Sequence, residues 1–318
     1  MNILVTGAAG LYGIHLIDQL VKEKDVKHII GFDNFSRAFL VKDPFIQSKE
    51  LKKKFKFYKR NYRTLALKEL NSFDLDFVVH LAAFISIPES MRMEKAYFMN
   101  NEFGTFQLIH LLHRTEKKPH FIFASSPEVY GSAIYAPMDE KHPMLPRSVY
   151  AVTKLASEKH CMAMHEWYGY PITIIRNFNT FGPNQNIFGN AAVVSNFIAR
   201  SVQGKNIVIH GDGLQTRDFQ FINDAVRAYV LTIMNSKKMI GKIVNIGTGK
   251  QTRIKDLAEI IVKLTKVKSK IKYVPTRGAD LRSLEANYNE IQALVGWKPQ
   301  YSLETGLKKT IDWFKQNI

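Results

Sequence analysis

Cysteine is almost absent from this sequence: Cys161 is the only one among 318 residues. A single cysteine cannot form an internal disulfide, and its place in a helical pattern favours burial as a small apolar side chain over catalysis. No uninterrupted apolar run reaches the ~18 residues of a membrane span. The histidine pairs 110/113 and 160/165 lack a suitable Asp, Glu or Cys pattern for a metal site and are better explained as helix-surface residues. We therefore expect neither a disulfide scaffold, a membrane protein nor a metalloenzyme.

Acidic residues are scarce beside basic ones, with 28 Asp and Glu against 45 Lys and Arg and a net charge of +17. This balance raises the local concentration of any anionic ligand. The densest basic stretch, residues 49–63, also carries aromatic residues that could stack on bases. We interpret it instead as a short helix and strand with solvated lysines, and predict no nucleic-acid partner. The first expected strand starts at residue 2, which leaves no room for a targeting signal, so we expect a cytoplasmic location.

Hydrophobic residues make up 46% of the chain, which is enough for a large core. Strand-like apolar runs alternate with helical patterns, and this alternation predicts an α/β fold with a doubly wound parallel sheet. A turn-rich segment, 179–184, marks a boundary. We expect a dinucleotide-binding Rossmann domain over 1–180, a smaller substrate-binding domain over 181–318, and a strand near 242–246 that returns to the main sheet. The apolar runs are 3–5, 28–32, 55–58, 77–82, 121–124 and 172–176.

The first strand ends in three glycines spaced three residues apart, and a helical pattern follows them. Gly7 permits a tight turn, Gly10 lets the backbone approach a pyrophosphate, and Gly13 lets the helix pack close to the strand. Asp33 follows at the end of the next apolar run, about 20 residues on. A carboxylate there binds the ribose hydroxyls and disfavours a 2′-phosphate. The pattern predicts NAD as the cofactor in preference to NADP.

A second set of polar residues follows the strand at 121–124. Ser125 and Ser126 come directly after it, and Tyr150 and Lys154 share one face of a helix that Ser148 is expected to cap. A neighbouring ammonium and an oxidised nicotinamide stabilise a phenolate. Tyr150 can then take a proton from a sugar hydroxyl while the hydride of that carbon leaves for NAD, with Ser126 bonded to the same hydroxyl.

In these motifs the chain resembles the NAD-dependent nucleotide-sugar epimerase/dehydratase family of extended short-chain dehydrogenases, from Asn2 nearly to Phe314. The resemblance implies a nucleotide-diphosphate sugar as substrate. The matching stretches are 6–13, 33–36, 80–83, 101–105, 125–131, 150–154, 176–179, 211–213, 216–219, 245–249 and 296–299.

The resemblance also assigns site residues and an assembly. Asn179 and Arg217 would grip the diphosphate, Arg277 would add a third contact, and Leu284 would limit the C2 substituent of the sugar. A homodimer would form through the helices at 103–113 and 150–168, where we expect an outward apolar strip of Leu108, Leu111, Met162 and Met164. The expected cofactor contacts are Gly7, Gly10, Leu11, Tyr12, Gly13, Asp33, Asn34, Leu81, Ala82, Ala83, Asn101, Ser125, Tyr150 and Lys154. The loop at 60–63 departs from the family, which often has an acid there.

The reaction outcome depends on few residues. In the family's 4,6-dehydratases the catalytic Ser or Thr is typically followed by Asp-Glu, but here Ser126 is followed by Pro127 and Glu128, and proline cannot deliver a proton. Residues 85–90 and 216–219 resemble the epimerase branch. We therefore predict an epimerase that removes the C4 hydride and returns it to a 4-keto intermediate, using Ser126, Glu128, Tyr150 and Lys154.

The alternatives are a 4,6-dehydratase or a sugar-acid decarboxylase that uses Glu128. A cofactor-binding structural protein is disfavoured because the catalytic set is present. The nucleotide, the sugar and the pathway stay open.

Overall fold

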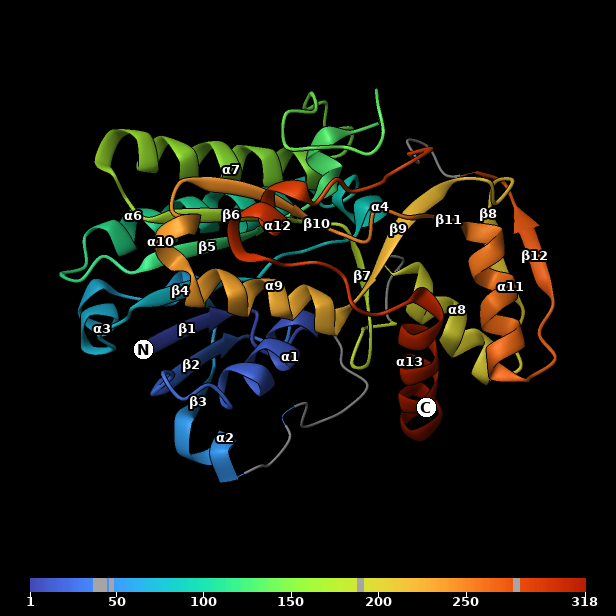
Figure 1. Ribbon diagram of the computed structural model, residues 1–318, viewed down its shortest axis with the longest axis horizontal. Helices are drawn as coiled ribbons and strands as arrows, with labels where there is room; N and C mark the ends of the chain where they lie inside the picture. The colour runs from blue at the N-terminus through green and yellow to red at the C-terminus, as the bar shows by residue number, and fades with distance from the viewer. Residues whose placement is uncertain (37–44, 46–48, 188–191, 277–280) are drawn as a thin grey trace.

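The computed structural model describes residues 1–36, 45, 49–187, 192–276 and 281–318. Its centre is a seven-stranded sheet in the order β10-β6-β5-β4-β1-β2-β3, parallel throughout and covered by helices on both faces (Figure 1). This arrangement confirms the predicted doubly wound α/β fold. The strands are β1 (Asn2–Thr6), β2 (His28–Asp33), β3 (Phe55–Lys59), β4 (Phe77–His80), β5 (His120–Ser125), β6 (Ile172–Asn177) and β10 (Lys242–Ile246).

Alternate residues of the strands fill two separate cores. Leu4 and Val78 point toward α6 (Gly104–His113) and α7 (Val149–Tyr168), whereas Ile3 and Val79 point toward α1 (Leu11–Leu20) and α9 (Ile222–Met234). Both faces are buried, which explains why the strands read as continuous apolar runs. The shorter helical segments of this half are α2 (Lys49–Lys54), η1 (Tyr62–Thr64), α3 (Leu67–Ser72), α4 (Ile87–Ser90), α5 (Glu94–Tyr97), the π-helical η2 (Phe98–Phe103) and η3 (Pro127–Tyr130).

Helix α7 has the predicted ends. The Ser148 Oγ accepts a hydrogen bond of 3.1 Å from the Ala151 N–H, and Gly169 closes the helix with a left-handed φ of 61°.

The prediction of an outward apolar strip on α6 and α7 is wrong. Leu108 and Met164 are buried in the core beneath these helices, and Leu111 and Met162 pack against it.

The segment after β6 builds a smaller unit beside the sheet. It contains two small sheets, β11-β9-β7 and β12-β8. Between β9 and β11 the chain returns to the main sheet, where β10 pairs in parallel with β6 and Thr173 faces Lys242. The strands are β7 (Asn179–Phe181), β8 (Ile207–His210), β9 (Thr216–Phe221), β11 (Gln251–Arg253) and β12 (Ile271–Val274). The helices are α8 (Val193–Val202), α10 (Ser236–Met239), α11 (Ile254–Thr265), α12 (Asn289–Val295) and α13 (Leu303–Asn317).

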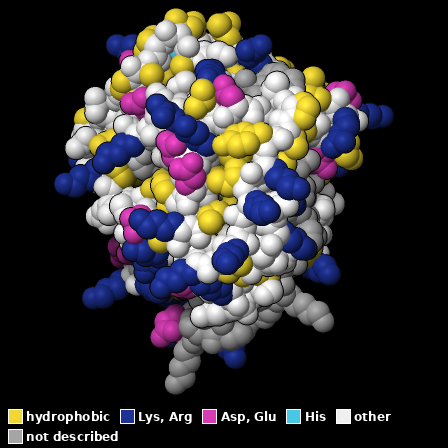
Figure 2. All heavy atoms as spheres, turned by 90° about the vertical axis from the view of Figure 1, so that its right-hand side faces the viewer, with side chains coloured by type: hydrophobic (Ala, Val, Ile, Leu, Met, Phe, Trp, Pro, Cys, Tyr) yellow, Lys and Arg dark blue, Asp and Glu magenta, His cyan; other side chains and the backbone are white. Residues whose placement is uncertain are grey.

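The excess positive charge is spread over the surface. On the face that α11 and β12 form, Lys and Arg side chains alternate with polar and apolar patches (Figure 2). Exposed lysines follow the end of α11 and run into β12: Lys263, Lys266, Lys268, Lys270 and Lys272. Within the described ranges no helix has the length and apolar character needed to cross a bilayer.

Two buried histidines of the sheet make stability depend on pH. His80 bonds to Thr6 Oγ1 at 2.6 Å and Thr105 Oγ1 at 3.0 Å, and burial lowers its pKa to about 3. His120 bonds to Thr173 Oγ1, and burial lowers its pKa to about 4. Both are neutral in the folded protein, whereas the unfolded chain takes up protons near pH 6.5. Their contribution to stability is therefore complete above pH 6.5 and is lost as the pH falls toward 4.

We expect the free energy of unfolding to fall below pH 6, with each histidine adding a slope of about 1.4 kcal/mol per pH unit. Urea denaturation between pH 4.5 and 7.5 measures this slope. His80→Gln should reduce the slope of the free energy of unfolding against pH by the contribution of one histidine. His28→Gln, at an exposed position, should leave the slope unchanged. Equal slopes in wild type and His80→Gln would contradict the prediction.

Candidate active site

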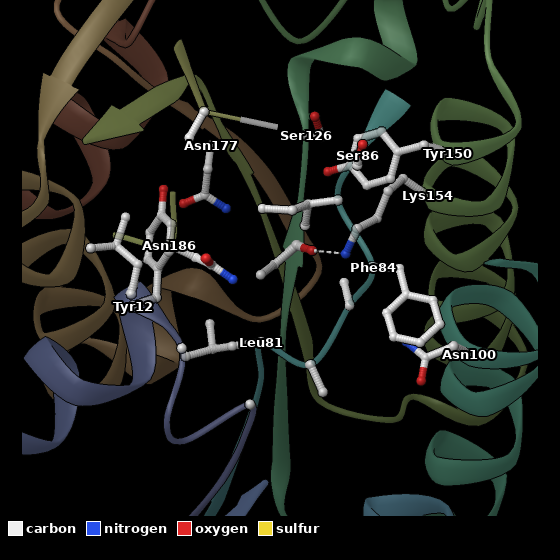
Figure 3. A pocket seen from close by; sticks show the side chains of 18 of the residues that line it. Tyr12, Leu81, Phe84, Ser86, Asn100, Ser126, Tyr150, Lys154, Asn177 and Asn186 are labelled. Carbon is white, nitrogen blue, oxygen red and sulfur yellow. Dashed lines mark hydrogen bonds between the residues drawn. The ribbon is translucent and has the colours of Figure 1, made fainter. Parts of the chain in front are cut away.

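A cleft of about 650 Å³ opens at the carboxyl ends of the central strands, where ligands bind in doubly wound sheets. It brings together the glycine turn after β1, the end of β2, the segments after β4 and β5, and the start of α7. The segments 81–87, 124–128, 177–180 and 184–186 line much of it. In Figure 3, Tyr150 and Lys154 lie on one side of the cleft, Tyr12 and Asn186 lie on the other, and Ser126 and Asn177 lie at one end.

The three glycines of the turn have different surroundings. Gly7 has a φ of +71°, and a Cβ there would lie 2.8 Å from the Ala82 nitrogen. A Cβ on Gly13 would lie 2.3 Å from the Gly7 carbonyl oxygen, so Gly13 packs against the turn and does not line the cleft. Gly10 lines the cleft, and a Cβ there would meet only the Gly7 carbonyl oxygen, at 3.3 Å. Gly10 is thus the position at which a ligand can approach the backbone.

Asp33, at the end of β2, lies beside this turn and lines the cleft. Its two carboxylate oxygens accept hydrogen bonds from the Ala9 N–H at 3.1 Å and the Phe35 N–H at 2.8 Å. Burial raises the pKa of Asp33, and these backbone bonds oppose the rise. The carboxylate is therefore held in place by the glycine turn itself, on the side where a ribose is expected.

Ser126, Tyr150 and Lys154 converge in the cleft, as expected. Ser126 follows β5, lies beside Tyr150 in the cleft (Figure 3), and accepts a bond of 3.3 Å from the Glu128 N–H. The Lys154 Nζ donates to the Ala124 carbonyl oxygen at 2.7 Å and lies 4.8 Å from the centre of the Phe123 ring.

Burial shifts the pKa of both members of this pair. It raises the pKa of Tyr150 to about 12, and the negative charge of Glu128 raises it further, while the Ser126 hydroxyl opposes the rise. Burial lowers the pKa of Lys154 to about 8. The expected role of the pair, in which the ammonium and an oxidised nicotinamide together stabilise the phenolate, stays a prediction.

Glu128 and Pro127 occupy the short helix η3, and both line the cleft. Glu128 is close enough to Tyr150 to affect the pKa of its phenol. Pro127 begins the helix and is buried. The carboxylate is thus next to the phenol, and the position before it carries no acid.

The other expected cofactor contacts divide into two groups. Leu11, Tyr12, Asn34, Leu81, Ala82, Ala83 and Ser125 line the cleft. Asn101 does not: it is 1% exposed, its Oδ1 accepts from the Phe84 N–H at 2.8 Å, and its Nδ2 donates to the Phe84 carbonyl at 2.8 Å. Asn100 lines the cleft instead. Both asparagines lie in the π-helical segment η2, whose wider turn changes which side chain faces the ligand.

The expected substrate contacts are also divided. Asn179 lines the cleft, and its Oδ1 is buried without a hydrogen-bond partner among the described residues. Arg217 lies away from the cleft and donates to the Leu281 carbonyl at 2.7 Å. Leu284 is fully buried in a cluster with Val129 and Phe178. Arg277 lies outside the described residues.

Sequence reasoning missed several residues that line the cleft. Thr180 of β7 is one of them, and its hydroxyl accepts a hydrogen bond from Tyr12 at the start of α1. The Arg60 guanidinium lies 5.1 Å from the centre of the Phe32 ring at the end of the cleft near Asp33. The missed lining residues include Phe84, Ser86, Asn100, Asn177 and Asn186. The signal available for them was weak, because most follow a strand end in segments without a glycine pattern.

Comparisons with known proteins agree over almost all of the chain. The family model described as GDP-mannose 4,6 dehydratase matches residues 4–310. The UDP-glucuronate 4-epimerase of Thermodesulfobacterium geofontis is 33% identical over 324 residues, covering 99% of this chain and 96% of that protein. The dTDP-D-glucose 4,6-dehydratase of Homo sapiens is 30% identical over 328 residues, covering 100% and 91%.

A solved structure gives the same result in three dimensions. The UDP-glucuronic acid 4-epimerase of Bacillus cereus, in complex with UDP-glucuronic acid and NAD, matches with a TM-score of 0.91 and 32% identity over 99% of both chains. The protein therefore belongs to the GDP-mannose 4,6 dehydratase family, a group of NAD-dependent nucleotide-sugar epimerases and dehydratases within the extended short-chain dehydrogenases.

Proposed function

We propose that this protein is an NAD-dependent nucleotide-sugar 4-epimerase that removes the C4 hydride, passes through a 4-keto sugar and returns the hydride to the opposite face. One observation carries the proposal: Ser126, Tyr150 and Lys154 line the same cleft as the glycine turn. Epimerisation at C4 needs one acid–base group at the C4 hydroxyl. Elimination needs a further proton donor, and Pro127 occupies the position where dehydratases carry it.

The residues around the glycine turn fit NAD. Gly10 leaves the backbone at the start of α1 open to a pyrophosphate, and Asp33 faces the place of the adenosine ribose. Bound NAD supplies the acceptor for the C4 hydride. Lys154 and Ser125, at the inner end of the cleft, would contact its nicotinamide half. In this assignment residues 1–180 bind the cofactor. Residues 181–318, together with Asn179, bind the sugar nucleotide.

Tyr150 is the acid–base group for the proton of the C4 hydroxyl. With a pKa raised to about 12 the phenol is protonated at neutral pH, and a positive charge beside it favours the phenolate. Lys154 supplies such a charge one helical turn away, when its ammonium leaves the Ala124 carbonyl. Tyr150 then removes the proton of the C4 hydroxyl and later returns it, while Ser126 holds the same oxygen.

Glu128 supports a second candidate function. Glu128 lines the cleft together with Tyr150, and its negative charge raises the pKa of the phenol. A base at that place would serve a 4,6-dehydratase or a sugar-acid decarboxylase. Both reactions share the C4 oxidation with epimerisation and differ from it in the fate of the 4-keto sugar.

An isotope experiment separates the candidates. We expect the wild-type enzyme to interconvert one C4 epimer pair from a panel of UDP-, GDP-, dTDP- and CDP-sugars in D2O, with no deuterium at C5 by NMR and no accumulation of NADH. Glu128→Gln should change turnover only modestly. Tyr150→Phe, incubated in parallel, reports any exchange that occurs without catalysis. Deuterium at C5, or NADH and ketosugar that build up together in Glu128→Gln, would support the second candidate and contradict the first.

We also propose a homodimer formed through α6 and α7. Rings on these helices are only partly buried: the centre of the Phe106 ring lies 4.2 Å from that of His110 and 5.2 Å from that of His160, and Phe98 of the adjoining η2 is 44% exposed. Partly exposed rings on two adjacent helices offer an apolar surface that a helix-bundle interface can cover.

Light scattering should give twice the chain mass of 36.5 kDa at micromolar concentration. We expect Phe106→Glu to give the monomer mass, because it places a charge within the interface. Tyr273→Glu, at a half-exposed position on β12, should leave the dimer intact. A monomeric wild-type protein would contradict the proposal.

A further inference from the structure

Two consecutive residues at the end of β5 are each hydrogen-bonded to a different turn of α7, and Ser126, the next residue, lies beside Tyr150 in the cleft. Ala124 accepts a bond of 2.7 Å from Lys154 through its carbonyl oxygen, and the Ser125 hydroxyl donates to Glu158. Tyr150, Lys154 and Glu158 follow one another at intervals of one helical turn and therefore share a face. Tyr150 and Lys154 belong to the proposed reaction, and Glu158 has no part in it so far.

Arg176 of β6 binds the Glu158 carboxylate through two hydrogen bonds. The Arg176 Nε donates to Glu158 Oε1 at 3.0 Å, and the Nη2 donates to Oε2 at 2.6 Å. The two side chains are 1% and 2% exposed, so the pair is removed from water. Arg176 also donates to the Tyr130 hydroxyl at 2.8 Å, and that hydroxyl donates to Asn245 of β10. The network thus joins β5, β6, β10, η3 and α7 directly behind the cleft.

We propose that Glu158 is a positioning residue for catalysis. Through Ser125 it keeps the end of β5, and with it Ser126, in register with Tyr150, and it places a carboxylate one helical turn from Lys154. This role rests on the proposed function, because it serves the Ser126, Tyr150 and Lys154 set.

The charged and titratable groups around Lys154 support an electrostatic effect of Glu158 on Lys154. On its own helix, Tyr150 lies one turn before it, and the pKa of Lys154 is raised by Glu158 and Cys161 against the larger effect of burial. From β4, His80 faces it as a neutral group whose pKa is lowered by burial and by Lys154. Arg176 on β6 reaches it only through Glu158, and Glu128 on η3 acts on Tyr150. Glu158 is therefore the carboxylate that raises the pKa of Lys154 against burial.

Glu158→Gln tests the role, because it keeps the shape and an oxygen for Ser125 but removes the charge. In protein with ¹³C-labelled lysine, with the Lys154 signal assigned by Lys154→Arg, we expect the Lys154 titration midpoint to fall by about 1 pH unit or more. The alkaline limb of the turnover profile should move with it. Ser125→Ala keeps the ion pair, so we expect an unchanged midpoint and a kcat about tenfold lower with little change in KM.

Asp224→Asn is the matched control: Asp224 is a fully buried carboxylate that pairs with Arg227 at 3.0 Å and does not line the cleft. It should lower stability without moving the Lys154 titration. If Glu158→Gln does not fold, Ser125→Ala alone still tests the positioning. An unmoved midpoint in Glu158→Gln, or wild-type turnover in Ser125→Ala, overturns the proposal. The titration needs no substrate, so it remains valid if the proposed reaction itself is wrong.

Discussion

Tyr150→Phe should lower turnover by about 10³-fold and leave the fold and NAD affinity intact. Phenylalanine keeps the ring that is buried at the start of α7 but removes the hydroxyl beside Ser126. That hydroxyl is the group to which we assign the proton of the C4 hydroxyl, and loss of a general base costs roughly 10²- to 10⁴-fold. Turnover of the sugar nucleotide found in the panel, together with NAD affinity by calorimetry, measures the two effects separately.

Tyr170→Phe makes the same chemical change away from the cleft. Tyr170 is buried, and its hydroxyl donates to the Pro119 carbonyl at 2.8 Å. We expect this variant to lose some stability and to keep its turnover. Full activity in Tyr150→Phe would contradict the mechanism, whatever the substrate proves to be.

Gly10→Ala is expected to raise the Kd for NAD by about 100-fold or more while the melting temperature changes little. Gly10 has a φ of −76° and a ψ of 173°, which alanine adopts without strain. The added methyl group would meet only the Gly7 carbonyl oxygen, at 3.3 Å, and would otherwise project into the space where the backbone meets the cofactor. We expect the substitution to reduce NAD affinity and not stability, because only the ligand needs that space.

Gly13→Ala should behave differently, because its methyl group would lie 2.3 Å and 2.5 Å from the carbonyl oxygens of Gly7 and Ala8. These are backbone atoms, so the turn must move, and we expect stability and NAD affinity to fall together. Gly169→Ala, at the end of α7 with nothing within 4 Å of the new methyl group, serves as the control with unchanged affinity. Wild-type affinity in Gly10→Ala would refute the assignment of this turn to the pyrophosphate.

The main sheet and the first half of the cleft were predictable because local patterns determine them. Apolar runs of strand length, the three glycines and the terminal Asp33 each depend on the conformation of a few neighbouring residues. Ser126 and the helix that carries Tyr150 and Lys154 were also predictable, since carboxyl ends of parallel strands meet at one edge of the sheet. The resemblance to a family added the order of these motifs along the chain.

Other features depended on contacts that no local pattern reveals. The π-helical turn of η2 places Asn100 at the cleft and turns Asn101 toward the backbone of Phe84. Arg217 donates to a carbonyl that is distant in the sequence, at Leu281. The pKa of Tyr150 depends on its burial, because that effect exceeds the influence of nearby charges. Each of these requires the packed structure.

The position of β10 has a consequence for how the protein is made. On the ribosome the chain emerges from its N-terminus, so β6 is available well before β10, its partner along the open side of the sheet. Until Ile246 has left the exit tunnel, the backbone groups of β6 on that side have no strand to pair with, and such an edge invites pairing with other chains. Completion of the nucleotide-binding sheet is therefore a late event of synthesis, which comes after translation of β7, β8 and β9.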